Sequence, residues 1–280
     1  MRGRASAPGS SGNLGPGFDT LALALELRCV VEAEPAEATV VVHDDGEEWC
    51  PGDDEIVARA VAAVGPPMRL WIRSEIPRRR GLGSSSAVAV ATVAAALRAR
   101  SAPVDPEEVF RVVAELEGHG DNAAASVFGG LQAACVGTAR RLELHPELIP
   151  IVAIPDFELA TGEAREALPA EVRHAAAARS VARAVFLVEG LRHADAGALR
   201  CARGDELHER PRSGLSPLTT RLVEVALEAG ALHAAWSGAG PSALALVREG
   251  AAAEVAAAMG RVLGPAGEVR RLAVAAEGLT

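Results

Sequence analysis

Apolar and polar positions alternate in short stretches along the first half of the chain. Residues 38–43 (ATVVVH) and 68–74 (MRLWIRS) follow the alternation typical of strands. Residues 84–100 begin with serines, continue with alanines and end with arginines, which predicts a helix. Residues 105–118 predict another helix, since an aspartate and a proline open it, its valines share one face and a glycine ends it.

The second half has a different character, with long stretches rich in alanine, arginine and glutamate. Residues 129–137 read as a turn into a buried strand, and a change in composition near 143–150 indicates a domain boundary. Beyond it, helices are expected over 163–203 and 216–230, followed by a strand at 243–247 (ALALV). Strands and helices mixed in irregular order indicate an α+β fold rather than a doubly wound sheet.

Composition narrows the class of protein. A length of 280 residues with 49% hydrophobic residues suits one large or two medium domains. The formal charge of −9 disfavours a nucleic-acid binder, and the absence of tyrosine with only 3% aromatic residues leaves no stacking platform for single strands. No stretch is long and apolar enough to cross a membrane, and the first residues lack the apolar middle of a secretory signal.

The cysteines suggest a reducing compartment. Four of them lie far apart without a CxxC pair, so the sequence indicates neither a disulfide framework nor a zinc site. We therefore expect four small, reduced core residues in a cytoplasmic protein.

The chain contains no lysine, so all 28 basic residues are arginines. This excludes the lysine of P-loop proteins, the strand lysine of protein kinases and Schiff-base chemistry. A protein of this composition that handles phosphate must use backbone N–H groups, a metal ion and arginine.

The strongest local signal is the turn at 81–86 (GLGSSS) before the expected helix. Its glycines let the backbone approach a ligand closely, and the free N–H groups at a helix start stabilise an anion. One of its serines would supply a hydroxyl to a phosphate or to Mg²⁺. The alternative is an ordinary turn that caps a core helix. The arginines at 78–80 either raise the local positive potential or form an exposed basic run.

A second cluster places Glu115, Glu117, His119, Asp121 and Asn122 within eight residues. Carboxylates beside an amide suit a metal-bound nucleotide and a hydroxyl acceptor, because Mg²⁺ prefers oxygen ligands. For the histidine, a turn residue bonded to backbone is favoured over catalysis. For the Asp-Asn pair, an Asx turn that caps the next segment is the alternative.

Three stretches, PGSSGNLGPGFDTLALAL (8–25), RGLGSSSAVAV and SGAGPSALAL, resemble in order and spacing the three motifs of the GHMP small-molecule kinases. Three more, EGHGDNAAASVFGG, ATGEAREALP and DELHERPR, resemble segments of the homoserine kinase family within that superfamily. The chain departs from the family pattern at Gly9 and Gly12, which add flexibility to the first motif, and at Pro211, which replaces a tyrosine.

The resemblance implies an α+β, two-domain GHMP kinase fold with the active site between the domains. Residues 1–147 would form a ribosomal-protein-S5-like domain that carries the first two motifs. Residues 148–280 would form a ferredoxin-like α/β-plait domain that carries the third. In that third motif, Gly238 and Gly240 would belong to a loop that supports the phosphate turn.

The resemblance also implies a site for ATP and Mg²⁺. Ser85 and Glu117 would contact the metal. Asp121 is the nearest candidate for a general base, although phosphoryl transfer depends more on positioning than on a strong base. The residues expected around the ATP phosphates are Arg80, Gly81, Leu82, Gly83, Ser84, Ser85 and Ser86. The expected catalytic set is Asn122, Asp121, Glu117 and Ser85.

For the second substrate, the family's binding residues fall on Asn13, Asp19, Asn122, Arg165 and Arg212. The two arginines would hold a carboxylate, the aspartate with Asn13 an ammonium, and Asn122 a hydroxyl. Without the resemblance, Arg165 reads as a helix-surface ion pair with Glu163 or Glu166, and Arg212 as a solvated loop residue.

The implied reaction is transfer of the ATP γ-phosphoryl group to the hydroxyl of L-homoserine, which yields O-phospho-L-homoserine and ADP in threonine biosynthesis. Two alternatives stay open: a GHMP kinase acting on mevalonate, a sugar or threonine, and a non-catalytic ligand-sensing relative. Neither a nucleic acid nor a membrane is an expected partner. A homodimer is one oligomeric state open to the chain.

Overall fold

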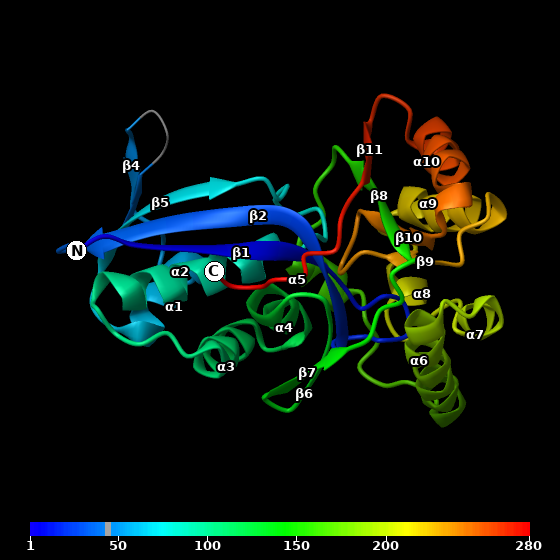
Figure 1. Cartoon of the computed structure of the whole chain (residues 1–280), viewed down its shortest axis with the longest axis horizontal. Coiled ribbons are helices and arrows are strands. Elements are labelled where there is room, and N and C mark those ends of the chain that lie inside the picture. Colours follow the sequence, from blue (N-terminus) through cyan, green and yellow to red (C-terminus); the bar gives the residue numbers. More distant parts are fainter. Residues whose placement is uncertain (43–45) are drawn as a thin grey trace.

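The computed structural model describes residues 1–42 and 46–280, which form two α+β regions, each built on its own sheet (Figure 1). The N-terminal sheet has the order β4-β3-β5-β2-β6-β7, with β1 paired to β2. Its pairs are antiparallel except for β3 and β5. Its strands are β1 (Gly3–Gly12), β2 (Leu21–Pro35), β3 (Val40–Val42), β4 (Glu48–Trp49), β5 (Met68–Ser74), β6 (Leu131–Cys135) and β7 (Thr138–Leu142).

Four helices cover one face of this sheet: α1 (Ile56–Val64), α2 (Ser84–Ala99), α3 (Pro106–Glu117) and α4 (Asp121–Phe128). The central helix α2 is rich in alanine and buried along most of its length. Because alanine is small, the helix packs closely against β1 and β2 and also against α1, α3 and α4. In α3, Asp105 caps the N-terminus by accepting from Glu107 N at 3.1 Å, and Gly118 ends the helix at φ 77°. Both predicted helices are therefore confirmed.

The C-terminal sheet is antiparallel, with the order β11-β8-β10-β9. Its strands are β8 (Ile149–Pro155), β9 (His233–Trp236), β10 (Ala243–Val247) and β11 (Gly267–Arg271). Helices α9 (Pro217–Glu228) and α10 (Glu249–Leu263) pack against it. A separate apolar cluster that includes Ile151, Leu222, Val255 and Met259 forms the core between these layers.

The helical segment expected over 163–203 is interrupted. It contains α5 (Thr161–Glu166), α6 (His174–His193) and α7 (Ala196–Cys201), and the short α8 (Glu209–Arg212) follows. Pro169 disfavours helical geometry at the residue before it, which accounts for the break after α5. Ala194 adopts the left-handed conformation that ends α6, and Asp195 caps α7 by accepting from Ala198 N at 2.6 Å.

The last residues of the chain return to the N-terminal sheet (Figure 1). Ser6 and Thr280 exchange two backbone hydrogen bonds of 2.8 and 2.9 Å, and Leu25 forms an isolated antiparallel bridge with Val274. Residues 273–280 therefore pack with the first region of the fold, although they follow the last strand of the second.

Other sequence expectations have mixed outcomes. The strands at 68–74 and 243–247 and the strand after Gly129-Gly130 are confirmed. The strand expected at 38–43 is observed as β3, and residue 43 lies outside the described residues. The cysteine expectation is wrong for three positions: Cys29 is buried, but Cys50, Cys135 and Cys201 are exposed. Over the described ranges, no helix is long and apolar enough to span a membrane.

Candidate active site

The phosphate turn at 81–86 rests directly on the first strand. Gly83 has φ 66° and stands at the N-terminus of α2, and a Cβ atom there would lie 2.3 Å from Ser10 Oγ. Ser10 N donates to Leu82 O at 3.0 Å. Glycine is therefore required both for the left-handed backbone and for this close approach. The turn leaves the first N–H groups of α2 at an anion-binding helix end.

The third glycine-rich motif closes against the other two. Ser237 Oγ donates to Gly81 O at 2.7 Å, and Gly238 N donates to Gly12 O at 3.0 Å. Gly238 and Gly240 both have positive φ, and Gly240 precedes a cis proline. Segments around residues 12, 81 and 238 thus meet in one place, and Gly238 and Gly240 lie in the loop that contacts the turn at 81–86 through Ser237.

The opening segment forms a closely bonded turn between β1 and β2. Asn13 and Asp19 have φ of 69° and 49°, and the Asn13 side chain accepts from Asp19 N at 3.0 Å. The same amide donates to Gly238 O at 2.9 Å and is buried. Asn13 therefore shapes the turn and joins it to the third motif, which leaves Asp19 as the group of this pair that offers a charge.

Asp19 and Arg165 form a two-point ion pair across the two regions of the fold. Arg165 Nη2 lies 2.8 Å from Asp19 Oδ1, and Nη1 lies 3.2 Å from Oδ2. The alternative of a helix-surface pair with Glu163 or Glu166 is wrong, because Arg165 pairs with Asp19 in the other region of the fold rather than with its own helix.

Arg212 lies in the same place but is buried, with 2% of its surface exposed, so the alternative of a solvated loop residue is wrong. Its Nε donates to Ala164 O at 2.9 Å, and its Nη1 donates to His208 Nδ1 at 3.1 Å. Burial and then the charge of Arg165 lower the pKa of Arg212 to about 10. Two cationic side chains thus converge on one side of the site, where an anionic group would neutralise them.

Glu117 joins the end of α3 to the start of α2. Ser86 Oγ donates to Glu117 Oε2, and Ser85 also bonds to this carboxylate. Desolvation raises the pKa of Glu117, although the charge of His119 and both serine hydroxyls partly offset this effect. The predicted pair of Ser85 and Glu117 is therefore brought together, and Ser86 belongs to the same oxygen cluster.

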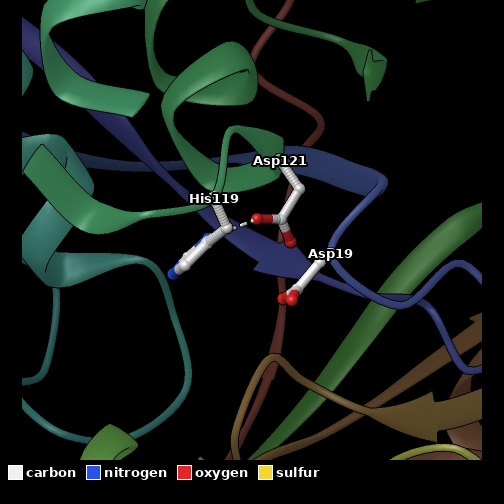
Figure 2. Close-up of side chains that lie close together, drawn as sticks. All are labelled: Asp19, His119 and Asp121. Atoms are coloured by element: carbon white, nitrogen blue, oxygen red, sulfur yellow. Dashed lines mark hydrogen bonds and ion pairs between the residues drawn. The ribbon is translucent and has the colours of Figure 1, made fainter. Parts of the chain in front are cut away.

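His119, Asp121 and Asp19 lie side by side, as Figure 2 shows. His119 Nδ1 is 2.7 Å from Asp121 Oδ1, so the expectation of a histidine bonded to backbone is wrong. Burial alone would lower the pKa of His119, but the hydrogen bond and charge of Asp121 outweigh it and the pKa is raised. Asp121 begins α4 without a side-chain cap, so the Asx-cap alternative is wrong too.

Asn122 is held beside the phosphate turn by the first strand. Ser10 Oγ donates to Asn122 Oδ1 at 2.9 Å. A Cβ atom on Gly12 would lie 2.8 Å from both Asn122 Nδ2 and Asp121 Oδ2. A Cβ atom on Gly9 would similarly lie 2.8 Å from Leu82 O. These glycines therefore permit close packing inside β1, and the expectation that they add flexibility is wrong.

The side chain of Arg80 extends away from the phosphate turn. Its Nε donates to Pro155 O at 2.8 Å, its Nη2 to Asp156 O, and its Nη1 lies 3.5 Å from Glu158. Arg79 also pairs with Glu158, at 3.6 Å. Two of the arginines at 78–80 therefore tie the turn to the end of β8.

Sequence reasoning missed two residues that hold the site together. The ring of Phe18 stacks on that of His208 with centroids 5.0 Å apart, and Arg165 and Arg212 lie 5.9 and 5.5 Å from the Phe18 centroid. Both residues stand inside stretches that resemble family motifs, one residue before Asp19 and four before Arg212. Their positions next to Asp19 and near Arg212 in the sequence could have indicated that they belong to the same site.

The fold and these three converging motifs define a GHMP kinase. The model of the GHMP kinases N terminal domain matches residues 55–130, and that of the GHMP kinases C terminal region matches residues 187–264. The fold alone spans different substrates, because a Streptococcus pneumoniae phosphomevalonate kinase, 16% identical, superposes with a TM-score of 0.74 over 97% of this chain and 99% of its own.

Closer relatives define the branch. A homoserine kinase of Thermus thermophilus is 40% identical over 97% of this chain and 96% of its own. A homoserine kinase of Deinococcus radiodurans is 38% identical over 85% of this chain and 82% of its own. The crystal structure of homoserine kinase from Cytophaga hutchinsonii, 25% identical, superposes with a TM-score of 0.84 over 100% of this chain and 96% of its own. The chain belongs to the homoserine kinase family.

Proposed function

We propose that this protein transfers the γ-phosphoryl group of ATP to the hydroxyl of L-homoserine, which yields O-phospho-L-homoserine and ADP for threonine biosynthesis. The observation that carries this proposal is the convergence of Asp19, Arg165 and Arg212, with Asp19 next to Asp121. One anionic and two cationic groups complement an amino acid, which carries an ammonium and a carboxylate. A sugar offers neither charge, and mevalonate offers only the carboxylate.

The nucleotide half of the reaction uses the turn at 81–86. Backbone N–H groups at the start of α2 and the positive end of its dipole would bind the ATP phosphates and stabilise charge on the transferred group. The serine hydroxyls of the turn lie next to this helix end. No lysine takes part, since the chain has none.

The oxygen cluster of Ser85, Ser86 and Glu117 fits a magnesium ion. A carboxylate and hydroxyls are the hard donors that Mg²⁺ prefers, and the carboxylate already accepts hydrogen bonds from both serines. Bound there, Mg²⁺ would neutralise charge on the ATP phosphates. We propose Ser85 and Glu117 as its protein contacts, with Ser86 fixing the carboxylate.

The acceptor hydroxyl would lie near Asn122 and Asp121. The hydrogen bond from Ser10 fixes the orientation of the Asn122 side-chain amide. That amide would in turn orient the acceptor hydroxyl toward the γ-phosphate. Asp121 is the proposed proton acceptor, and its bond to His119 holds its carboxylate in place. In-line transfer to a positioned hydroxyl requires little more from the protein.

The test is ADP release by the purified protein with ATP, Mg²⁺ and a panel of alcohols: L-homoserine, L-threonine, mevalonate and galactose. The proposal expects L-homoserine to be the preferred substrate by kcat/KM. Turnover of mevalonate or galactose in preference to L-homoserine would contradict the substrate, and ATP binding without turnover of any alcohol would contradict enzyme activity.

A further inference from the structure

His208 lies immediately before α8 and is completely buried. Its ring joins the two regions of the fold. Nε2 lies 2.8 Å from the carbonyl oxygen of Gly15, in the turn that carries Asp19, and Nδ1 lies 3.1 Å from Nη1 of Arg212. Asp205 fixes the backbone at this point, since its carboxylate accepts from His208 N at 2.5 Å and from Glu209 N at 3.0 Å.

The two ring contacts require one protonation state. A carbonyl oxygen only accepts, so Nε2 carries the proton and donates to Gly15. A guanidinium only donates, so Nδ1 carries a lone pair and accepts from Arg212. The neutral Nε2–H tautomer alone meets both conditions. Burial lowers the pKa of His208 to about 4, the charge of Arg212 adds to this effect and the charge of Asp205 opposes it, so the ring is neutral at neutral pH.

The acceptor atom Nδ1 of His208 helps to fix the orientation of the Arg212 guanidinium. Its Nε is bound by Ala164 O and its Nη1 by His208, while its Nη2 makes no hydrogen bond within the described ranges. Two fixed nitrogens set the plane of the guanidinium and leave the third free for a ligand. Without the lone pair of His208, the Ala164 carbonyl would be the remaining hydrogen-bond partner, and the guanidinium would rotate about that bond.

We propose that His208 is a positioning residue that fixes the plane of Arg212 for the carboxylate of the amino-acid substrate. The inference rests on the proposed function, since it requires a substrate that carries a carboxylate. It assigns to the histidine no contact with the substrate.

Two substitutions separate its two hydrogen bonds. The glutamine amide reaches the position of Nε2, so His208→Gln keeps the bond to Gly15 O and loses the acceptor for Arg212. The asparagine amide reaches the position of Nδ1, so His208→Asn keeps an acceptor for Arg212 and loses the bond to Gly15. We expect His208→Gln to raise the KM for L-homoserine by about tenfold with kcat and the KM for ATP nearly unchanged. We expect His208→Asn to stay within about threefold of the wild-type KM.

Equal KM values for His208→Gln and the wild type, or an equally large loss in folded His208→Asn, would overturn the proposal. Should His208→Gln not fold, His208→Asn tests the proposal alone, because a KM raised about tenfold or more in that folded variant contradicts it. His233→Gln is the matched control. It also replaces a buried histidine bound to the same turn, through Leu14 O at 3.0 Å, and its KM is expected to be unchanged.

A double-mutant cycle with Arg212→Ala supplies a readout that general loosening would not move. If His208 acts through Arg212, His208→Gln adds no further rise in KM once the arginine is gone. A full additional rise would overturn the proposal. Failure of the wild type to phosphorylate L-homoserine would instead refute the proposed function, so the two failures are distinguishable.

Discussion

Asp19 and Arg165 bind each other with two contacts of 2.8 and 3.2 Å, although the sequence resemblance assigns them to opposite ends of one substrate. Asp19 belongs to the turn after β1, and Arg165 belongs to α5 in the second region of the fold. About a third of each side chain is exposed, 34% and 38% respectively, so water screens the pair and separating it costs little. A zwitterionic substrate can therefore separate the pair. Its ammonium would bind Asp19 in place of Arg165, and its carboxylate would bind Arg165 in place of Asp19.

Arg165→Ala is expected to raise the KM for L-homoserine by about 10- to 100-fold, because a charge-assisted contact to the carboxylate is lost. The KM for ATP should change by less than about twofold, since the arginine faces Asp19 and not the phosphate turn. Steady-state kinetics with each substrate varied in turn measures both. Arg192→Ala removes an exposed arginine paired with Glu143 and is the control. Equal rises in both KM values would contradict the assigned role.

The individual elements of this fold follow from local patterns. The helix over 105–118 has a capping aspartate, a proline in its first turn and a terminal glycine, and it forms within two residues of its expected bounds. The sequence did not predict the breaks between α5, α6 and α7, because alanine and arginine favour helix throughout this segment. Pro169 accounts for the end of α5, and the cap at Asp195 sets the start of α7. Local propensity is weaker there than turn chemistry.

The candidate site was predictable in composition but not in arrangement. Motifs spread between residues 8 and 246 gave the glycine turns and the charged side chains. The pairing of Asp19 with Arg165 joins a turn of the first region to a helix of the second, and no local pattern encodes that contact. Arg212 was expected to be solvated because a short polar stretch surrounds it. Its burial is imposed by Phe18 and Ala164 from other elements and by His208, which lies immediately before its own helix.

Glu117→Gln is expected to raise the Mg²⁺ concentration for half-maximal activity by about tenfold or more. Glutamine keeps an oxygen that accepts from Ser86 but removes the negative charge that a metal ion requires. The measurement is activity against free Mg²⁺ at saturating ATP and L-homoserine. Glu115→Gln is the matched control, because Glu115 lies two residues earlier on α3 and is exposed. An unchanged Mg²⁺ dependence in Glu117→Gln would show that this carboxylate is not a metal contact.

Asn122→Ala is expected to lower kcat by about 10- to 100-fold, because the acceptor hydroxyl loses the group that orients it. Ser10→Ala leaves the amide in place and removes only its hydrogen bond, so kcat should fall in the same direction by a smaller factor. Single-turnover measurements at saturating substrates report the chemical step directly. A larger loss in Ser10→Ala than in Asn122→Ala would mean that the serine acts independently of the amide.

His233 has surroundings that make protonation unfavourable. Its Nε2 lies 3.0 Å from Leu14 O and therefore donates, while its buried Nδ1 has no hydrogen-bond partner in the described parts of the chain. Burial lowers the pKa of His233 to about 4, partly offset by the bond to Leu14, and the charge of Arg203 lowers it further. A proton on Nδ1 would place a charge with no acceptor beside a cation.

The stability of the protein should therefore fall as pH drops from about 6.5 to 4. In that window the unfolded chain binds a proton on this histidine and the folded chain does not, so His233 alone makes the free energy of unfolding rise with pH by up to about 1.4 kcal/mol per unit. His233→Gln keeps a donor for Leu14 and removes the titration, so its unfolding free energy, measured by urea titration at each pH, should fall less steeply than that of the wild type. His174→Gln, at the exposed start of α6, is the control. Identical slopes for His233→Gln and wild type would contradict a neutral buried histidine.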